Sequence, residues 1–347
     1  MDSKRKFKSF INGLSKEDHI AIIHHMDTDG ICSTVIMSRA LERQGYKVER
    51  LMGSSYYMFS YSHLKALRDE GINKLIFLDI AVDQFPNIKQ ELTLFDAVLV
   101  VDHHKTYKNI NAPKITLVKA EYLNPKITGS DYCATHMVFD LMSEVVDISD
   151  LDWIVAVGMI TDITDAKQGK FLDRMYKKYK TTRQQLLDVG VVIDAGKQAN
   201  PPQVDRAREV VLEAKSYKDI LNSPFSKIAK GIKNEIDFWV NKFEEKAENK
   251  KDIWLYEIDP SASVIASVST ILALKYPEYS IIVVHHYKDQ VSISARNHLR
   301  KRAMNTLLET AVKGFKGANA GGHVPAAGAG IREKDYAEFK KRLWKLA

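Results

Sequence analysis

Three apolar runs in the first third of the chain each lead into acidic or histidine side chains. Residues 21–23 precede His25, residues 74–78 precede Asp79, and residues 97–101 precede Asp102. Continuous apolar strands that alternate with helical segments are typical of a mostly parallel sheet, because helices cover both of its faces. Such folds bind ligands at the carboxyl ends of their strands. The sequence therefore predicts an α/β, doubly wound fold whose ligand site is built from the residues that follow these strands.

The first of these segments carries His25, Asp27 and Asp29 at alternate positions, and a helix is expected to begin just after Gly30. Alternate residues of an extended segment point to one side, so these three side chains are expected to converge. Acids crowded in this way repel each other, and a divalent cation relieves the repulsion. On this segment alone, a polar turn with scattered aspartates explains the pattern equally well, because short motifs match by chance.

Composition narrows the class of protein. The chain has 347 residues, long enough for two domains, and 45% of them are apolar, enough for well-packed cores. The formal net charge of +7 favours a polyanionic partner. Only two cysteines are present and they form no CxxC pair, which argues against a disulfide framework and a structural zinc site. Because the basic start lacks the apolar core of a signal peptide and no run approaches the about 20 apolar residues of a membrane span, a cytoplasmic protein without membrane attachment is expected.

Two α/β regions separated by a charged helical stretch are expected along the chain. Further strands are predicted at residues 47–52, 253–258, 281–284 and 291–295, and helices at 1–20, 62–70, 84–93, 131–146, from 151, 263–274 and 304–313. Residues 167–250 are rich in Lys, Arg, Glu and Gln with recurring apolar positions, which indicates helices rather than disorder. We therefore expect a larger domain at 1–195, a helical connection at 196–250 and a smaller α/β domain at 251–347.

Four short motifs carry the strongest functional signal. They are His25-Met26-Asp27-Thr28-Asp29-Gly30, Leu78-Asp79, Asp102-His103-His104 and Gly158-Met159-Ile160-Thr161-Asp162. Their order and spacing resemble those of the DHH phosphoesterase superfamily. A fifth motif, Gly321-Gly322-His323, stands where that family's C-terminal DHH-associated domain carries its substrate-binding motif. The resemblance covers most of the chain and implies a catalytic DHH domain at 1–195, a substrate-binding domain at 251–347, and an active-site cleft between them.

The motif side chains also make chemical sense as a pair of metal sites. Six or seven Asp and His side chains can hold two cations if one carboxylate bridges them. Two metals about 3.5–4 Å apart can activate a water, bind phosphate oxygens and stabilise a leaving oxygen. Hard carboxylates with a minority of imidazoles suit Mn²⁺, with Mg²⁺ or Co²⁺ as substitutes. Two divalent cations, with Mn²⁺ as the first choice, are therefore the expected cofactors.

The resemblance implies a role for each motif residue. The first metal would be held by three side chains, His25, Asp27 and Asp79. The second metal would be held by four, Asp29, Asp79, His103 and Asp162, which makes Asp79 the bridging ligand. Asp102 would orient an imidazole or act as a further ligand. His104 would contact the scissile phosphate or assist proton transfer.

The C-terminal region offers candidate contacts to the substrate. Gly321 and Gly322 allow close backbone approach, and His323 adds a donor to an anion. Without the upstream motifs, an ordinary glycine-rich loop would be the preferred interpretation of this stretch. Arg296, at the end of a predicted strand, resembles the family's arginine that grips a nucleotide phosphate, and its planar guanidinium suits that geometry.

Three further residues with similar chemistry are expected to lie outside the site. Asp83 is close to Asp79 in the sequence but is interpreted as a solvated residue at a helix start. His285 and His286 end a predicted strand without nearby acids, so both are interpreted as structural.

The position of the first histidine separates members of the superfamily. Family II pyrophosphatases place it four residues before the first aspartate of the motif, where this chain has Ile23. Here His25 stands two residues before Asp27, which is the pattern of RecJ-like exonucleases and nano-RNases. Bacterial RecJ proteins are longer and add an OB-type domain, so the compact, Lys- and Ile-rich chain resembles archaeal RecJ-like exonucleases. The resemblance implies a metal-dependent exonuclease that hydrolyses single-stranded DNA or RNA, with a role in DNA repair.

Two alternatives stay open. A nano-RNase or a cyclic-dinucleotide phosphodiesterase would use the same motifs on short nucleotides. Some relatives are non-catalytic replication scaffolds that bind helicase components, but those have lost metal ligands, whereas this chain keeps every expected one. Because an active nuclease can also dock on a helicase, the expected partners are single-stranded nucleic acid or short oligonucleotides and, in addition, a replication or repair helicase.

Overall fold

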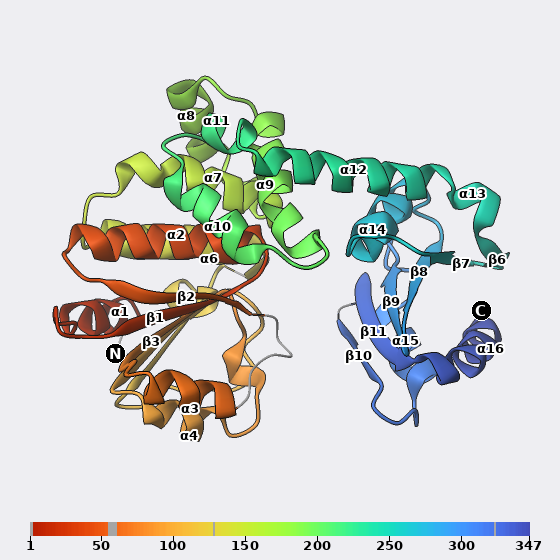
Figure 1. The fold of residues 1–347 in the computed structure, drawn as a ribbon, viewed down its shortest axis with the longest axis horizontal. Helices are drawn as coiled ribbons and strands as arrows, with labels where there is room; N and C mark the ends of the chain where they lie inside the picture. The colour runs from red at the N-terminus through yellow and green to blue at the C-terminus, as the bar shows by residue number, and fades with distance from the viewer. Residues whose placement is uncertain (1–2, 55–60, 128, 323) are drawn as a thin grey trace. The chain divides into compact units, whose positions relative to one another are not determined.

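The computed structural model describes residues 3–54, 61–127, 129–322 and 324–347 (Figure 1). The chain forms two compact units. The first consists of Met1–Lys197 with Pro202–Ala229, and the second of Gln198–Pro201 with Lys230–Ala347. Each unit contains one β-sheet with its own helices, which confirms the predicted α/β class.

The first unit alternates strands with helices. Its strands are β1 (Ile20–His25), β2 (Val48–Ser54), β3 (Lys74–Leu78), β4 (Ala97–Asp102) and β5 (Ile115–Lys119). Its α-helices are α1 (Ser3–Asn12), α2 (Thr28–Arg43), α3 (Tyr61–Asp69), α4 (Ile88–Glu91), α5 (Ala120–Leu123), α6 (Ala134–Ser143), α7 (Asp152–Thr161), α8 (Gly169–Tyr179), α9 (Arg183–Gln198), α10 (Val204–Glu213) and α11 (Tyr217–Leu221). Short 3₁₀ segments are η1 (Val82–Gln84), η2 (Leu92–Leu94), η3 (Gly129–Asp131), η4 (Ser149–Leu151) and η5 (Asp165–Lys167).

The sheet of the first unit has the order β2-β1-β3-β4-β5, and all neighbouring strands are parallel. The second strand lies on one side of β1 and the third on the other, so the direction of winding reverses between β1 and β3. Loops that follow such a pair of strands diverge, and ligands bind at this switch point. His25 ends β1 and Asp79 follows β3, so the fold places both residues there.

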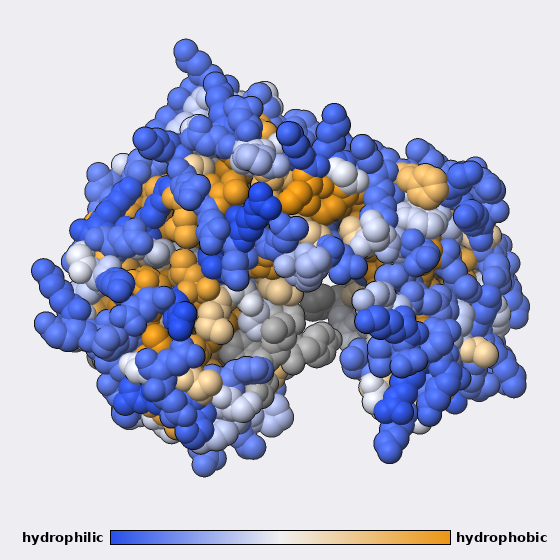
Figure 2. Space-filling model, in the orientation of Figure 1, coloured by the Kyte–Doolittle hydropathy of each residue, from blue (hydrophilic) through white to orange (hydrophobic). Residues whose placement is uncertain are grey.

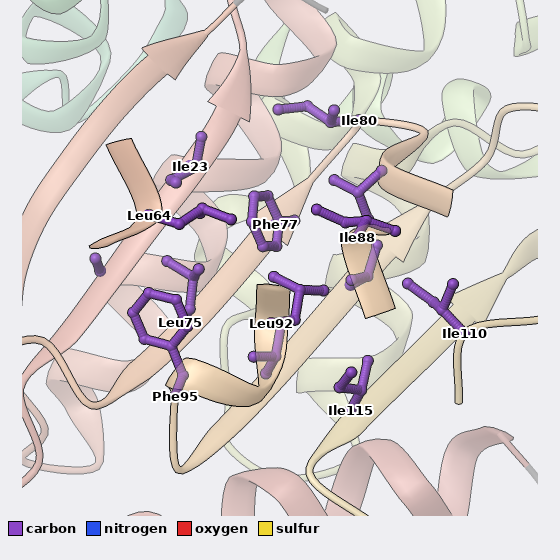
Figure 3. Packing of buried hydrophobic residues seen from close by; sticks show 14 of the residues in the cluster. Ile23, Leu64, Leu75, Phe77, Ile80, Ile88, Leu92, Phe95, Ile110 and Ile115 are labelled. Atoms are coloured by element: carbon purple, nitrogen blue, oxygen red, sulfur yellow. The ribbon is translucent and has the colours of Figure 1, made fainter. Parts of the chain in front are cut away.

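Apolar side chains cover both faces of this sheet. Figure 3 shows one face, where Leu75 and Phe77 of β3 lie among Leu64 of α3, Ile88 of α4 and Leu92 of η2. These side chains are at most 5% exposed, and each buried aliphatic or aromatic side chain contributes about 1.5–3 kcal/mol to stability. Helices α2 and α6 contact strands β1 and β4 as well as each other. A sheet buried on both faces explains why its strands read as continuous apolar runs.

Helix α2 begins earlier than the sequence pattern predicts. It starts at Thr28 rather than after Gly30, because the Asp27 side chain accepts a hydrogen bond from the Gly30 amide and caps the helix. Asp29 therefore lies in the first turn of a helix instead of continuing an extended segment. The expectation that His25, Asp27 and Asp29 converge as alternate residues of one strand is wrong for Asp29.

Strand β5 was not expected from the sequence. Its five residues pair in parallel with β4, and Lys119 stands opposite Asp102 at the carboxyl end of the pair. The run is short and lies between Lys114 and Lys119, so it lacks the continuous apolar character of the other strands. Its strand identity comes from pairing with β4, which no local pattern records.

The second unit has a mixed sheet in the order β10-β11-β9-β8-β7-β6, in which β7 and β8 are parallel and the other pairs antiparallel. Its strands are β6 (Glu248–Lys250), β7 (Ile253–Ile258), β8 (Ser280–Tyr287), β9 (Gln290–Arg296), β10 (Asn319–Gly322) and β11 (Ala326–Arg332). The remaining helices are α12 (Phe225–Asn241), which contains the boundary between the units, α13 (Phe243–Lys246), α14 (Ile265–Lys275), α15 (Met304–Val312), η6 (Glu333–Asp335) and α16 (Tyr336–Leu346).

The C-terminal part of this unit differs from its prediction. No strand is predicted at 317–328, but this stretch contributes β10 and the start of β11; β10 pairs in register with β11, and β11 with β9. Helix α16 was not predicted at all, and its Phe339 and Leu343 are fully buried against the sheet. Glycine and alanine carry little strand signal, so pairing partners decide their conformation.

The surface of the chain is mainly hydrophilic on the face shown in Figure 2, where apolar side chains appear between polar ones. Cys32 and Cys133 are buried and unpaired. Among the described ranges, none of the helices combines the length and the apolar character needed to cross a bilayer.

Candidate metal centre

Three side chains gather at the carboxyl ends of β1 and β3. The imidazole Nδ1 of His25 lies 2.7 Å from Asp27 Oδ2 and 3.5 Å from Asp79 Oδ2. One ligand atom from each of these residues fits within a sphere suited to a single cation. Asp79 is almost completely buried, whereas His25 and Asp27 are about a quarter exposed, so the group opens towards solvent on one side.

Asp79 adopts a backbone conformation that non-glycine residues rarely use. Its φ is 61°, in the left-handed region, where aspartate and asparagine are tolerated better than most side chains. Its amide donates to the Val101 carbonyl at 3.0 Å, which anchors the residue to the end of β4. Its buried Oδ1 lies 3.3 Å from His103 Nε2 and meets no hydrogen-bond donor in good geometry within the described part of the chain. A buried carboxylate oxygen without a donor is what a cation would satisfy.

A second group contains His103, Asp29 and Asp162. His103 Nε2 lies 3.8 Å from Asp29 Oδ2, and its Nδ1 lies 3.7 Å from Asp162 Oδ2. The same Nδ1 bonds to the Gly129 carbonyl at 2.9 Å, which places a proton on Nδ1. Nε2, which faces Asp29 and Asp79, is then the nitrogen that offers a lone pair to a metal.

Asp29 has a structural task besides its place in this group. Its Oδ2 accepts from the Ala134 amide and its Oδ1 from the Thr135 amide, both at 2.8 Å. The carboxylate therefore caps the start of α6, which it joins to α2. Each carboxylate oxygen has two lone-pair directions, so these bonds leave room for a cation.

The pKa of His25 in the first group is raised, and so are the pKa values of both acids that join His103 in the second group. Burial alone would lower the pKa of His25, but Asp27 and Asp79 outweigh it and raise that pKa well above its ordinary value. Burial, with the Asp79 carboxylate, raises the pKa of Asp29 to about 6. Burial, with the Asp29 carboxylate, raises the pKa of Asp162 to about 8. Carboxyl groups that hold protons near neutral pH mark a site that lacks positive charge, as a metal site does without its ion.

The third group contains Asp79, His103 and His104. His104 is anchored by Asp102, whose Oδ1 lies 2.7 Å from the His104 Nδ1 and 3.3 Å from its backbone nitrogen. Asp102 is fully buried and belongs to none of the three groups found among the described residues, so its position is that of an orienting partner. His104 is one-third exposed and can meet a substrate.

Asp83 lies in the first turn of η1, as predicted for a residue at a helix start, but the prediction that it is solvated is wrong. Its side chain is fully buried and its Oδ1 lies 3.0 Å from the ammonium of Lys119, which is equally buried. The other carboxylate oxygen accepts from the backbone amides of Tyr107 and Lys108 at 2.6 and 3.2 Å. Sequence reasoning also missed Lys119, which ends β5 much as Asp102 ends β4. A strand prediction at 115–119 would have revealed it.

Helix α9 contributes two further residues that sequence reasoning missed. Asp194 Oδ1 accepts from the Thr28 amide at 3.0 Å and from the Thr28 hydroxyl at 2.8 Å. Lys197 lies 3.2 Å from Asp194 and 3.9 Å from Asp27. A cavity of about 50 Å³, large enough for an ion or one or two waters, is lined by Asp27, Thr28, Asp29, Thr161, Asp162, Asp194 and Lys197. No local pattern in α9 points to this role.

A larger cavity lies away from these groups. It has a volume of about 500 Å³ and is lined by α1 and the amino-terminal ends of the sheet strands, including Lys6, Lys74 and Lys114. None of the motif residues borders it. The size of a cavity therefore does not locate the candidate site in this chain, whereas the grouping of Asp and His side chains does.

In the second unit, Arg296 is held by neutral acceptors. Its Nη1 donates to the carbonyls of Ala295 at 2.9 Å and Ala327 at 3.3 Å, and its Nε donates to the Thr270 hydroxyl at 3.2 Å. Within the described ranges, no carboxylate forms an ion pair with it, so its charge is not neutralised by a neighbouring acid. Burial lowers the pKa of Arg296, and an anion would offset that cost.

The glycine motif lies at the edge of the same sheet. Gly322 has φ 132°, and a Cβ there would lie 2.5 Å from the Ala326 carbonyl oxygen, so only glycine fits. Gly321 has open space around its α-carbon and is not constrained in this way. Gly322 pairs with Ala327, next to the residue that pairs with Arg296. His323 lies outside the described residues.

The expectation that His285 and His286 lack acidic neighbours is wrong. His286 Nδ1 lies 2.9 Å from Glu333, and its Nε2 lies 3.6 Å from Glu257. His285 Nε2 lies 3.6 Å from Asp259. These acids come from β7, the residue after it, and η6, so pairing in the sheet brings them together across many residues of sequence.

The residues present fit divalent cations. The two groups His25-Asp27-Asp79 and Asp29-His103-Asp162 offer carboxylate oxygens with one imidazole each, the ligand mixture of hard and borderline cations. Asp79 supplies the orphaned oxygen, and the raised carboxyl pKa values indicate missing positive charge. Thiolates are absent from all three groups found among the described residues, which disfavours soft metals.

The fold of the chain is similar to that of RecJ. A structure of exonuclease RecJ bound to manganese has a TM-score of 0.78 at 15% identity, over 100% of this chain and 94% of that chain. RecJ from Thermus thermophilus in complex with Mn²⁺ has the same TM-score of 0.78 at 15% identity over 100% of this chain. This chain spans about half of that longer protein, 55% of its length. At such identities the likeness shows a shared fold.

Two other relatives share the fold at lower similarity. CDC45 from Entamoeba histolytica has a TM-score of 0.63 at 11% identity, over 99% of this chain and 98% of that chain. The pGpG-specific phosphodiesterase PggH from Vibrio cholerae has a TM-score of 0.53 at 13% identity, over 95% of this chain and 98% of that chain. No curated protein sequence matches the chain significantly.

Two family models match the sequence itself. Residues 19–165 match the N-terminal domain of the DHH family, and residues 251–347 match the DHHA1 domain. The first segment contains every residue of the metal groups, and the second contains Arg296 and the glycine motif. Together, the two matches show that the chain combines a DHH-family N-terminal domain with a C-terminal DHHA1 domain, on a fold like that of RecJ.

Proposed function

We propose that this protein is a metal-dependent phosphodiesterase that degrades single-stranded DNA or RNA from an end with the help of two divalent cations. The observation that carries the proposal is the position of Asp79 between two ligand groups. Its Oδ2 lies 3.5 Å from His25 Nδ1, and its Oδ1 lies 3.3 Å from His103 Nε2. A carboxylate with one oxygen towards each group has the arrangement that a bridging ligand needs.

The proposed ligands follow the two groups. His25, Asp27 and Asp79 would hold one cation. Asp29, Asp79, His103 and Asp162 would hold the other. Mn²⁺ is the proposed ion because the donors are mostly carboxylates with some imidazole, and RecJ structures hold Mn²⁺ or Mg²⁺. Bound in this way, the cations would lower the pKa of a water and offset the negative charge that develops on the phosphate.

The chain's own side chains would orient the reaction. Asp102 keeps a proton on Nδ1 of His104 and fixes the ring, so His104 meets the scissile phosphate or passes a proton in one defined orientation. His103 is fixed in the same manner by the Gly129 carbonyl. Both histidines follow a buried strand, so little freedom is lost when a substrate binds.

The proposed substrate is a single-stranded polynucleotide. The proposed metal ligands belong to the first unit, and residues 251–347 are proposed to bind part of the substrate. The net charge of +7 favours a polyanion. Arg296 carries a charge that no described carboxylate neutralises, as an arginine that binds phosphate requires. Gly321, Gly322 and His323 are proposed to hold the nucleotide beside the scissile phosphate.

One experiment tests this proposal. End-labelled single strands of DNA and RNA, from two nucleotides upward, are incubated with the protein and Mn²⁺ beside a cyclic dinucleotide and pyrophosphate. Stepwise shortening of long strands from one end, abolished by a chelator, is the expected result. Hydrolysis of pyrophosphate alone, or activity that survives excess chelator, would contradict it.

A second candidate is a phosphodiesterase for short nucleotides, which the fold similarity to PggH favours. In that case dinucleotides would be cleaved faster than strands of twenty nucleotides in the same assay. A docking role on a replication or repair helicase is a third proposal, supported by the fold similarity to CDC45. Because the metal groups are complete, this docking would accompany catalysis rather than replace it.

A further inference from the structure

Lys119 is a fully buried cation at the carboxyl end of β5. Its ammonium lies 2.5 Å from Asp102 Oδ2 and 3.0 Å from Asp83 Oδ1, and both acids are also fully buried. It further donates to the backbone carbonyls of His104 at 3.2 Å and Lys105 at 3.4 Å. A buried charge is strongly disfavoured unless groups of opposite charge lie beside it, and here two buried carboxylates do so.

These contacts converge on the segment that follows β4. Lys119 holds the carbonyls of His104 and Lys105, while Asp83 holds the amides of Tyr107 and Lys108. The segment that carries the two histidines is thus tied at its beginning and its end to one buried ion pair. Neither member of the pair is found in the three candidate ligand groups of the described chain.

Asp102 stands between Lys119 and His104. One of its oxygens meets the ammonium, and the other meets the Nδ1 of the His104 ring at 2.7 Å. Rotation of the Asp102 carboxylate would therefore disturb its contact with the Lys119 ammonium and its hydrogen bond to the His104 ring at the same time. The order ammonium, carboxylate, imidazole resembles an anchor that sets both the orientation and the tautomer of the ring.

We propose that Lys119 is a positioning residue, whose buried ammonium holds Asp102 in the orientation that fixes the His104 ring for its role at the phosphate. Lys119 itself does not meet the substrate, and Asp83 balances its charge from the opposite side. The expected effect on kcat rests on the proposed phosphodiesterase function. Its structural content concerns only the hydrogen bond between His104 and Asp102.

The test uses a charge-balanced variant, because Lys119→Met alone would leave two buried carboxylates without a cation and endanger folding. The double variant Lys119→Met with Asp83→Asn removes one charge of each sign. The asparagine oxygen still accepts the two backbone amides that Asp83 accepts, and methionine fills the space of the lysine stem. The matched control is Lys74→Met with Asp18→Asn, another mostly buried pair of the first unit, 3.7 Å apart and far from the motifs.

The first measurement does not depend on activity. In the full-length, metal-free protein, the Nδ1 proton of His104 should give a downfield resonance in the nuclear magnetic resonance spectrum, assigned by its loss in His104→Gln. It should be shifted or broadened away in the Lys119→Met, Asp83→Asn variant and unchanged in the control pair. An unchanged resonance in that variant would overturn the proposal.

The second measurement separates positioning from stability. The variant should lose kcat on an oligonucleotide by about 10- to 100-fold, with KM and calorimetric Mn²⁺ affinity within about threefold of wild type. In a His104→Gln background, the same change should cost little more, because it acts through that ring. If the double variant lowered kcat by the same factor in the wild-type and His104→Gln backgrounds, or left kcat unchanged, the proposal would be overturned. An inactive wild-type protein would instead count against the proposed function, and the resonance would still test Lys119.

Discussion

Gly30 lies so close to His25 that a Cβ at this position would stand 2.2 Å from the His25 carbonyl oxygen. The turn from β1 into α2 brings the two backbones together, because Asp27 caps the helix between them. The glycine of the first motif is therefore a steric requirement of the turn that connects three proposed metal ligands, His25, Asp27 and Asp29. It is not required by a left-handed backbone.

Gly30→Ala should consequently damage both stability and metal binding. The turn must open to admit the methyl group, which we expect to cost about 1–3 kcal/mol of unfolding free energy and to move Asp27 away from His25. Thermal unfolding and calorimetric Mn²⁺ titration measure the two effects. Gly231→Ala in α12 is the control, because its α-carbon faces open space, and it should stabilise by about 0.5–1 kcal/mol. Wild-type Mn²⁺ affinity in Gly30→Ala would refute this account of the turn.

Asp79→Asn should abolish hydrolysis while the protein stays folded. Asparagine tolerates the left-handed backbone of this position, whereas alanine would add strain of about 1–2 kcal/mol. Loss of the carboxylate removes the proposed bridge between the two groups, so Mn²⁺ affinity should fall together with activity. Circular dichroism and calorimetry check both points. Asp69→Asn, an exposed change at the end of α3, should leave both unaffected. Turnover by Asp79→Asn at the wild-type rate would exclude the bridging role.

The metal-free protein should lose stability as the pH rises from about 5 to about 8. Burial and neighbouring acids raise the pKa of Asp29 to about 6 and that of Asp162 to about 8 in the fold. Because both pKa values exceed those of the unfolded chain, the folded state binds more protons, and its advantage disappears as those protons leave. The raised pKa values of His25 and His103 act in the same direction.

Mn²⁺ should reverse this trend, because it replaces the protons as the source of positive charge. The melting temperature measured in chelator should fall as the pH rises across this range. The increase in melting temperature that Mn²⁺ causes should become larger as the pH rises. An increase in melting temperature that is the same at pH 5.5 and pH 8 would show that these acids do not bind the ion.

Single strands should be degraded faster than blunt duplexes, and binding should weaken with salt. A polynucleotide backbone that contacts several lysines and arginines releases counterions, so the logarithm of affinity should fall linearly with that of the salt concentration. Fluorescence anisotropy at several salt concentrations, beside cleavage of labelled strands, measures both. Equal cleavage rates on the two substrates would favour an enzyme that acts on short nucleotides.

Arg296→Gln should separate substrate binding from metal binding. Glutamine places an amide nitrogen where Arg296 has its Nε, so it can keep the hydrogen bond to the Thr270 hydroxyl, but it removes the charge that lacks a carboxylate partner. We expect an unchanged Mn²⁺ affinity and a loss of oligonucleotide cleavage of about tenfold or more, as for a lost contact to a phosphate. His323→Ala should behave in the same way, with hydrolysis of a small nitrophenyl phosphodiester less affected. Weakened Mn²⁺ binding in either variant would contradict the proposal that Arg296 and His323 bind the substrate and not the metal.

The class of fold and most of the motif residues followed from local patterns. Continuous apolar runs that end in acids predict parallel strands with a site at their carboxyl ends, and β1, β3 and β4 have that form. His25, Asp27 and Asp79 come together because they end or follow two such strands, β1 and β3, which are neighbours in the sheet. Periodicity and strand ends are properties of short segments, so a sequence displays them directly.

Other features were decided by partners distant in the sequence. Lys119 is buried because β5 pairs with β4 and places it opposite Asp102, and Asp83 of η1 lies beside it. Asp194, 166 residues beyond Thr28, caps the same helix that carries Asp29. A solvated acid and a buried, paired acid look alike in a sequence, because only the fold determines whether water or a cationic side chain surrounds the carboxylate. The chain by itself thus determined which side chains could hold a metal, and the tertiary structure decided which charges are buried beside them and how each is balanced.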